Sequence, residues 1–324
     1  MHVRPIGKQD TAGLRVAVTG AAGFIGRALV DRLARGALGA VAELRLNDVH
    51  PFERAGAEVV LGSYAEAAVR DRLVGGGVDV LFHLASLPGG AAERDPALGK
   101  AVNLDGSMAM LDAVVASATP SRPPTIVYAS SIAALGMAKA AVNDATALRP
   151  SGSYGTHKAM VEFYLADLTR RGWVDGRSVR PAGIVARPRA AFAGFATAWM
   201  SELFHAAVEQ GRFTIPAQAQ AHVWLQSVDK VADNIVHAAL MPAAGLSAQR
   251  AWTLPATVAR IDQLIEALRR RAGPAFTVDH APGLVDQPPL DARAALSVGF
   301  TSDGDTEALV DAVVSRLQAQ RSGA

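Results

Sequence analysis

Short runs of apolar and β-branched residues alternate along the first half of the chain with longer stretches in which apolar residues recur every three or four positions. The first pattern is typical of buried strands and the second of amphipathic helices. The runs that predict strands are 14–19, 42–47, 57–61, 79–84, 125–130 and 178–184. Helices are predicted over 24–35, 96–118 and 153–171, with a proline-rich loop at 119–124. This alternation predicts an α/β fold with a Rossmann-type, doubly wound parallel sheet covered by helices on both faces.

The regular alternation weakens after about residue 186. The pattern there predicts helices over 195–210, 228–241, 258–272 and 305–318, and short strands over 212–215 and 251–254. We therefore expect three parts: an N-terminal extension (1–13), a Rossmann core (14–186) and a smaller C-terminal α/β lobe (187–324). The last part is expected to bind the substrate and to be interleaved with the core.

Charge and hydropathy exclude several classes of protein. Lysines and arginines number 32 against 30 acidic residues, and the longest basic runs are the short ones at 170–171 and 269–271. No basic block of the length expected for a nucleic-acid partner is present. Residues 1–12 lack the apolar stretch of a signal peptide, and no window of about 18 residues is typical of a membrane span. The sequence thus predicts a cytoplasmic protein with no membrane or nucleic-acid partner.

The chain has no cysteine. Disulfides, thiol catalysis and cysteine-based zinc sites are therefore excluded. The eight histidines form no HExxH motif or other close cluster, so no metal site is expected.

A glycine-rich turn joins the first predicted strand to the first helix. Gly20, Gly23 and Gly26 follow a G-x-x-G-x-x-G spacing directly after the strand. Gly20 permits a tight turn, Gly23 lets the backbone approach a pyrophosphate, and Gly26 allows close packing of helix on sheet. The phosphates would lie on the N–H groups of the helix N-terminus, next to Phe24 and Ile25. The pattern predicts a dinucleotide-binding site.

Asp48 ends the second predicted strand, 22 residues beyond Gly26. That spacing is close to the one expected of an acid that binds the ribose hydroxyls of the adenosine half. A carboxylate there repels a 2′-phosphate, and no arginine adjoins it. The cofactor is therefore expected to be NAD rather than NADP.

Tyr154 and Lys158 form a Y-x-x-x-K pair near the start of the helix predicted over 153–171. Four residues apart, their side chains share one helix face. An ammonium group beside a phenol stabilises the phenolate and lowers the tyrosine pKa toward working pH. We expect Tyr154 to be the catalytic acid/base, with Lys158 supporting it and binding the nicotinamide ribose.

Two serines follow the strand predicted over 125–130, at the carboxyl edge where open α/β sheets bind ligands. Ser131 is expected to be catalytic by hydrogen-bonding the reacting oxygen beside Tyr154, whereas Ser130 is expected to be structural. Asn103, in the preceding helical stretch, could hold an active-site water or the local helix geometry.

These residues together resemble the extended short-chain dehydrogenase/reductases, also called the NAD-dependent epimerase/dehydratase family. The resemblance extends from residue 14 to about 260 and includes the strand that ends at Leu84 and Ala85. It implies that Leu84, Ala85 and Asn103 join the cofactor site. Long helices flanking the sheet often pair two subunits in this family, which leaves a homodimer as a possible assembly.

Within the family, the segments 153–177, 181–188 and 224–227 resemble the D-erythronate dehydrogenases, which oxidise the C2 hydroxyl of a four-carbon sugar acid to a 2-oxo acid. His222 stands roughly where members that bind nucleotide sugars carry an arginine, which disfavours a diphosphate. The expected substrate is a small hydroxy acid whose hydroxyl is bound by Ser131 and Tyr154. Arg187 is the first candidate for its carboxylate and the loop 88–90 the second.

Three alternatives stay open on the same scaffold. One is a sugar or nucleotide-sugar epimerase or dehydratase, in which the hydride returns to the substrate. Another is a threonine- or uronate-type dehydrogenase, which would differ in the substrate lobe. The third is a non-catalytic NAD-sensing or protein-binding relative, against which the intact set of Ser131, Tyr154 and Lys158 argues.

Overall fold

The chain folds into two compact units in the computed structural model. The residues that the structure describes are 13–118, 123–137, 140–189, 197–247, 250–281, 283 and 285–322. Unit 1 comprises residues up to 136, 148–180 and 232–252, and unit 2 comprises 137–147, 181–231 and the residues from 253 onward. The predicted extension at 1–13 lies outside the described residues except for Gly13, as do residues 119–122 of the predicted loop.

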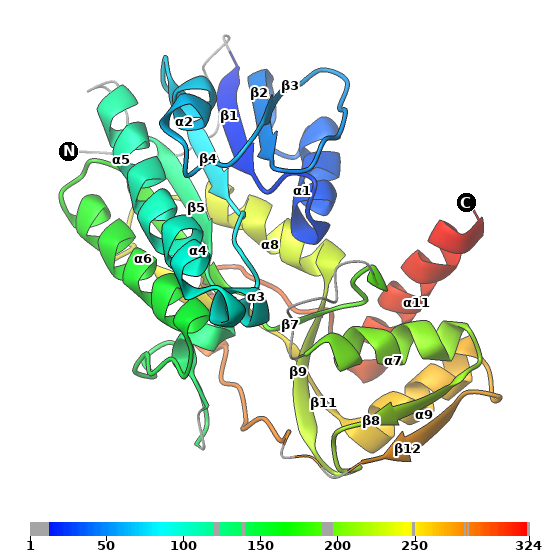
Figure 1. Cartoon of the computed structure of the whole chain (residues 1–324). Coiled ribbons are helices and arrows are strands. Elements are labelled where there is room, and N and C mark those ends of the chain that lie inside the picture. The colour runs from blue at the N-terminus through cyan, green and yellow to red at the C-terminus, as the bar shows by residue number, and fades with distance from the viewer. Residues whose placement is uncertain are drawn as a thin grey trace. The chain divides into compact units, whose positions relative to one another are not determined.

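Unit 1 is built on a seven-stranded sheet with the strand order β10-β6-β5-β4-β1-β2-β3 (Figure 1). Its strands are β1 (Leu14–Thr19), β2 (Val41–Asp48), β3 (Glu58–Leu61), β4 (Val80–His83), β5 (Thr125–Ala129), β6 (Asp175–Arg180) and β10 (Ala251–Thr253). Strands β1 to β6 pair in parallel, and the register places Thr19 beside both Asn47 and His83. The carboxyl ends of β1, β2 and β4 therefore meet at one edge, where open α/β sheets bind their ligands.

Helices cover both faces of this sheet, which confirms the predicted doubly wound α/β class (Figure 1). The helices of unit 1 are α1 (Phe24–Ala34), α2 (Ala67–Val74), α3 (Gly89–Arg94), α4 (Pro96–Lys100), α5 (Ser107–Ser117), α6 (Ser153–Arg170) and most of α8 (Val228–Leu240). One core packs α2, α5 and α6 against sheet residues such as Leu81 and Ile126. On the other face, Arg32 of α1 donates to Asp233 of α8.

Two of the predicted elements of unit 1 are wrong in detail. The helix predicted over 96–118 is broken into α4, a π-helical segment (Ala101–Gly106) and α5. The strand predicted over 178–184 begins at Asp175 and ends at Arg180, and residues 183–185 form a separate strand in unit 2. Pro181 separates the two strands, because it has no N–H group to pair within a sheet.

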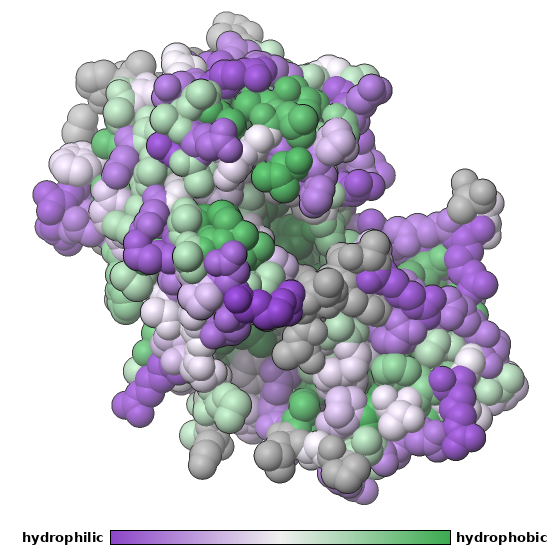
Figure 2. Space-filling view, in the orientation of Figure 1, coloured by the Kyte–Doolittle hydropathy of each residue, from purple (hydrophilic) through white to green (hydrophobic). Residues whose placement is uncertain are grey.

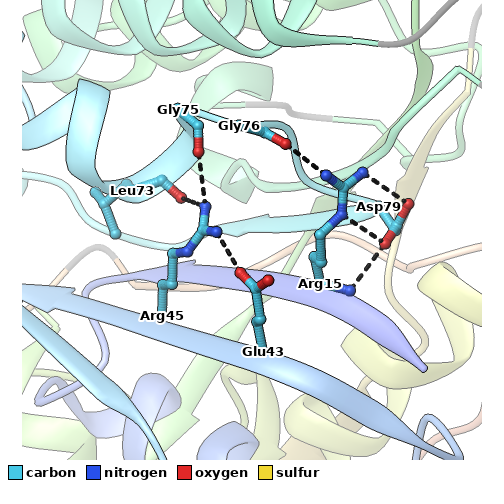
Figure 3. A network of polar contacts seen from close by, with 7 residues as sticks. All are labelled: Arg15, Glu43, Arg45, Leu73, Gly75, Gly76 and Asp79. Carbon is cyan, nitrogen blue, oxygen red and sulfur yellow. Dashed lines mark hydrogen bonds and ion pairs between the residues drawn. The ribbon is translucent and has the colours of Figure 1, made fainter. Parts of the chain in front are cut away.

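A network of polar contacts fixes the edge of the sheet at which β1 begins (Figure 3). The Arg15 guanidinium and the Arg15 N–H both donate to Asp79, with the N–H to Oδ2 distance at 2.8 Å. Arg45 donates to the carbonyls of Leu73 and Gly75 at 3.2 and 3.1 Å, and in this way caps the C-terminal end of α2. This network supports the scaffold and lies away from the carboxyl ends of the strands.

Unit 2 contains a three-stranded sheet, a two-stranded parallel sheet and three helices packed on a common core. Its strands are β7 (Gly183–Val185), β8 (Arg212–Ile215), β9 (His222–Ser227), β11 (Thr257–Arg260) and β12 (Thr277–His280). The main helices are α7 (Ala198–Val208), α9 (Ile261–Ala272) and α11 (Thr306–Ser322), and α10 (Arg293–Ser297) is a short one. Each of the three main helices buries apolar side chains in this core, for example Leu203 of α7, Ile265 of α9 and Val313 of α11.

The predicted helix over 258–272 is wrong at its start. Residues 257–260 form strand β11, which pairs antiparallel with β9, and the helix begins only at Ile261. Burial alternates along β11 between inward Thr257 and Ala259 and the more exposed residues between them, which is the period of a strand. Four residues are too few to separate this period from that of the helix that follows.

Hydrophilic residues are spread over the visible surface of each unit, with apolar residues between them (Figure 2). Such mixing is ordinary for a protein surface.

Within the described ranges, no helix is both long and apolar enough to cross a membrane. In the same part of the chain, no three histidine or acidic side chains gather in a way that could hold a metal ion.

Candidate active site

The glycine turn between β1 and α1 leaves no room for side chains. Gly20 has a φ of +74°, and a Cβ atom there would lie 2.8 Å from the Ala85 nitrogen at the end of β4. A Cβ atom on Gly26 would lie 2.0 Å from the Gly20 carbonyl oxygen. Glycine is required at both positions, at the first by conformation and contact and at the second by contact alone.

The start of α1 fits a pyrophosphate group. The helix is capped by Gly23, which has no side chain to accept hydrogen bonds from the first N–H groups. The backbone N–H groups of Phe24, Ile25 and Gly26 have no partner within the helix and point out of its N-terminal end. The helix dipole favours an anion there. The turn is therefore suited to the phosphates of a dinucleotide.

Asp48 lies beside this turn. It is buried, and its two carboxylate oxygens each accept one backbone N–H, from Ala22 and His50, at 3.0 Å. A carboxylate has about four acceptor positions, so the capacity to accept from two ribose hydroxyls is left over. The contact with Ala22 also ties the end of β2 to the glycine turn.

The end of β4 is held by a buried polar chain. The Thr19 hydroxyl oxygen accepts the N–H groups of Leu84 and Ala85, both at 3.2 Å, and lies 2.8 Å from His83 Nδ1. With its lone pairs engaged, the hydroxyl donates to Nδ1, so His83 carries its proton on Nε2 and donates to Ser107 Oγ at 3.0 Å. Burial, with the charge of Lys158 as a second cause, lowers the pKa of His83 to about 3. The imidazole is neutral and structural.

Asn103 holds the segment that follows β4. Its side-chain oxygen accepts the Leu87 N–H at 2.6 Å and its amide donates to the Leu87 carbonyl at 2.9 Å. This double contact accounts for the burial of Asn103 in the π-helical segment. The role of Asn103 in this structure is to position residues 84–88, and a contact of its own with the cofactor stays a prediction.

Tyr154 and Lys158 lie on α6 as predicted. Lys158 is buried, its Nζ donates to the Ala129 carbonyl at 2.6 Å, and it lies 5.6 Å from the centre of the Tyr154 ring. Burial lowers the pKa of Lys158 to about 7, while the negative charge of Glu162 acts in the opposite direction. The Lys158 Nζ atom is thus fixed at the carboxyl end of β5, beside the phenol that it is expected to support.

Ser131 lies in the same region because α6 packs directly on the segment after β5. Ser131 Oγ accepts the Ala133 N–H at 3.1 Å at the start of a short 3₁₀ helix (Ile132–Leu135). A Cβ atom on Gly155 would lie 2.3 Å from the Ala133 carbonyl oxygen. The absence of a side chain at Gly155 therefore brings the Ser131 segment next to Tyr154. Ser130 Oγ is buried and has no hydrogen-bond partner among the described residues.

Several contacts of this site escape sequence reasoning. The segment 88–90 is predicted as a loop, but Gly89 and Gly90 begin α3, and a Cβ atom on Gly89 would lie 3.5 Å from Tyr154 Cβ. The Tyr64 hydroxyl donates to the Val102 carbonyl at 2.8 Å, and its ring lies edge-on to His83 at 4.9 Å between centres. The Lys158 Nζ atom lies 4.7 Å from the centre of the Tyr128 ring. None of these contacts follows a motif, because each joins segments that are distant in sequence.

Unit 2 contains the predicted substrate residue Arg187. Its N–H donates to Ser201 Oγ at 3.1 Å and its carbonyl oxygen lies 2.7 Å from His205 Nε2. Arg187, Thr197 and Ser201 line a small cavity of about 10 Å³. A cavity of this size holds about one water molecule, so the role of Arg187 in binding a carboxylate stays a prediction.

His222, also in unit 2, lies beside an acid. Its N–H donates to Asp286 Oδ1 at 2.8 Å, and its Nδ1 lies 3.4 Å from the same oxygen. A carboxylate at this position repels a diphosphate. The resemblance implies a nucleotide-contacting arginine near this position in members that bind nucleotide sugars. Here His222 and Asp286 lie there instead.

The glycine turn, Asp48 and the Tyr154–Lys158 pair are the features expected of an NAD-dependent short-chain dehydrogenase/reductase. A model of the NAD dependent epimerase/dehydratase family matches residues 16–270, and the chain belongs to that family. It is an NAD-dependent oxidoreductase, and NAD is its cofactor.

Two relatives and one solved structure are similar over nearly the whole chain. The D-erythronate dehydrogenase of Cupriavidus necator is 32% identical and covers 92% of this chain and 97% of its own length. That of Haemophilus influenzae is 28% identical, covering 92% of this chain and 98% of its own length. The crystal structure of the nucleoside-diphosphate-sugar epimerase from Agrobacterium tumefaciens matches with a TM-score of 0.86, 28% identity and 98% coverage of both chains.

Proposed function

We propose that this enzyme oxidises the C2 hydroxyl of a small sugar acid of the D-erythronate type to the 2-oxo acid. The observation that carries the proposal is the similarity to two D-erythronate dehydrogenases over 92% of the chain. The grouping of Ser131, Tyr154 and Lys158 supports the same chemistry. NAD, when bound, supplies the acceptor for the hydride.

Tyr154 acts as the general base in this proposal. Ser131 Oγ and the Tyr154 hydroxyl oxygen hold the substrate hydroxyl, and Tyr154 as phenolate takes the hydroxyl proton. Lys158 stabilises that phenolate with an ammonium group held against the Ala129 carbonyl. The substrate carbon then becomes a carbonyl as it loses its hydrogen with both electrons.

The carboxylate of the substrate needs a partner of opposite charge. Arg187 of unit 2 is the first candidate for this role, because its guanidinium can pair with a carboxylate at two points. The segment 88–90 at the start of α3 is the second candidate, since Gly89 lies against Tyr154.

The test is NADH formation, followed by ultraviolet absorbance, with purified protein and a panel of aldonic acids, uronates and threonine. We expect turnover of D-erythronate with NAD⁺ in preference to NADP⁺, and loss of turnover in Tyr154→Phe. Tyr154→Phe keeps the ring and removes only the hydroxyl, so cofactor binding should persist in the variant. Turnover that survives this change would remove Tyr154 from the mechanism.

A nucleotide-sugar epimerase is the second candidate, favoured by the similarity to the Agrobacterium tumefaciens structure. In an epimerase the hydride returns to the substrate, so no net NADH appears. The pairing of His222 with Asp286 disfavours a diphosphate and ranks this candidate second. Isomerisation of a sugar nucleotide without net reduction of NAD⁺ would support it.

We also propose a homodimer located in the cytoplasm. The outer side of α6 exposes Met160 and Phe163, which are one helical turn apart and 46% and 58% exposed. Light scattering of the purified protein gives the mass, and Phe163→Glu is expected to convert a dimer to a monomer. Fractionation of the producing cells tests the location.

A further inference from the structure

Three side chains of α6 follow one another at intervals of four residues: Tyr154, Lys158 and Glu162. Residues at this spacing lie on one face of a helix with their Cβ atoms about 5–6 Å apart. Lys158 and Glu162 are 2% and 5% exposed, so neither charge is screened by water. A buried ammonium group needs an anion nearby if it is to remain protonated.

The groups that face Lys158 come from three elements. Tyr154 and Glu162 lie on its own helix, Tyr128 faces it from β5, and His83 faces it from β4. His83 is neutral because its pKa is lowered to about 3, and burial raises the pKa of Tyr128 well above its ordinary value. The hydrogen-bond partner of the Lys158 Nζ atom is the uncharged Ala129 carbonyl. Glu162 is therefore the resident anion in this set.

Arg180 fixes the Glu162 carboxylate. Its Nε donates to Glu162 Oε1 at 2.9 Å and its Nη2 donates to Oε2 at 2.6 Å, a two-point contact between β6 and α6. Arg180 is 4% exposed, and its Nη1 has no hydrogen-bond partner among the described residues. A pair held this rigidly keeps the carboxylate at one distance from Lys158 and prevents it from taking the lysine's proton.

We propose that Glu162, held by Arg180, is a positioning residue that keeps the proton on Lys158, so that the Tyr154 phenolate forms beside an ammonium group. Burial alone lowers the pKa of Lys158, and the charge of Glu162 opposes that effect. The importance of this for catalysis rests on the proposed function of Tyr154. The claim about the Lys158 proton does not, and it is tested in the protein without any substrate.

The direct test is the titration of Lys158 by NMR. The chain has only five lysines, so protein made with ¹³C-labelled lysine gives few Cε signals, and Lys158→Met identifies the one that belongs to Lys158. Loss of an opposite charge shifts a pKa by roughly one unit or more. We expect the midpoint of Lys158 to fall by roughly that amount in Glu162→Gln.

Asp167→Asn is the matched control. Asp167 is on the same helix, is 39% exposed and pairs with Arg170 and Arg171 on the side away from Lys158. Its neutralisation should leave the midpoint of Lys158 unchanged. A midpoint that stays the same in Glu162→Gln, or falls equally in Asp167→Asn, overturns the proposal and leaves the Glu162–Arg180 pair as a structural tie.

A double variant covers the case in which Glu162→Gln alone does not fold. Replacing both members of a buried pair with neutral residues often preserves stability, and Glu162→Gln/Arg180→Met should lower the midpoint by less than the single change does, because it also removes the positive charge of Arg180. In turnover assays the acid limb of the kcat profile should move to higher pH with little change in KM. A shifted Lys158 midpoint without turnover of any sugar acid would contradict the proposed substrate and leave this inference standing.

Discussion

Replacing Gly155 with alanine is expected to separate the two halves of the catalytic group without unfolding the protein. The added Cβ atom would lie 2.3 Å from the Ala133 carbonyl oxygen and 3.0 Å from Pro150 Cβ. Contacts of a Cβ atom under 3.0 Å essentially never occur, so the start of α6 must move by at least about 0.7 Å from the Ser131 segment. Both neighbours are backbone or proline, which cannot turn aside as a flexible side chain would.

The Gly155→Ala change has two opposing effects on the free energy of unfolding and a separate effect on kcat. Overpacking of this kind costs about 1–3 kcal/mol, and the higher helix propensity of alanine returns about 1 kcal/mol. The free energy of unfolding should therefore fall by about 0–2 kcal/mol. A displacement of nearly 1 Å between Ser131 and Tyr154 should lower kcat by roughly 10- to 100-fold, because catalysis depends steeply on the alignment of the reacting groups.

Urea unfolding and steady-state kinetics of the same preparation separate the two effects. Gly211→Ala is the control, since the nearest atom to a Cβ atom there is 3.7 Å away and its kcat should be unchanged. If Gly155→Ala keeps kcat within twofold of the unmodified enzyme, the packing of α6 on the Ser131 segment does not set the catalytic geometry and the reasoning fails.

Three further changes test other parts of the site. Asp48→Asn removes the charge that opposes a 2′-phosphate, so the ratio of kcat/KM with NAD⁺ to that with NADP⁺ should fall at least tenfold; an unchanged ratio would mean that another residue selects the cofactor. His83 has a folded-state pKa of about 3, below its unfolded value of about 6.5, so its contribution to stability is complete above the unfolded pKa and is lost as the pH falls toward 3. We therefore expect the free energy of unfolding, measured with urea between pH 7 and 4, to decrease less steeply in His83→Gln than in the unmodified protein. Below pH 6.5 the two slopes should differ by about 1.4 kcal/mol per pH unit, and equal slopes would argue against a neutral buried imidazole. Arg187→Ala should raise KM for the sugar acid at least tenfold with partial recovery in Arg187→Lys, and an unchanged KM would remove Arg187 from the substrate site.

Local motifs carried much of the site prediction. The glycine turn, Asp48 and the Tyr154–Lys158 pair each lie within one strand–helix junction or one helix, so spacing alone places their members. The alternation of strands and helices likewise predicted the parallel sheet, because that pattern permits few other arrangements. Such features depend on neighbours in sequence.

Contacts between distant segments could not be predicted in this way. The chain from Thr19 through His83 to Ser107 joins three elements, and the pairing of Glu162 with Arg180 joins a helix to a strand. Each of these side chains has an ordinary place in its own segment, and only the fold shows that they meet. The sequence predicts a helix where β11 lies for a related reason, because the pairing of β11 with β9 determines its conformation.

The measurement that tests the central claim most directly is NADH formation with NAD⁺ and D-erythronate, compared between the unmodified enzyme and Tyr154→Phe. We predict stoichiometric conversion of D-erythronate to its 2-oxo acid by the unmodified enzyme, and a rate at least about 100-fold lower in the variant. No net NADH from any hydroxy acid, together with isomerisation of a sugar nucleotide, would contradict this prediction and leave the fold assigned to a different reaction.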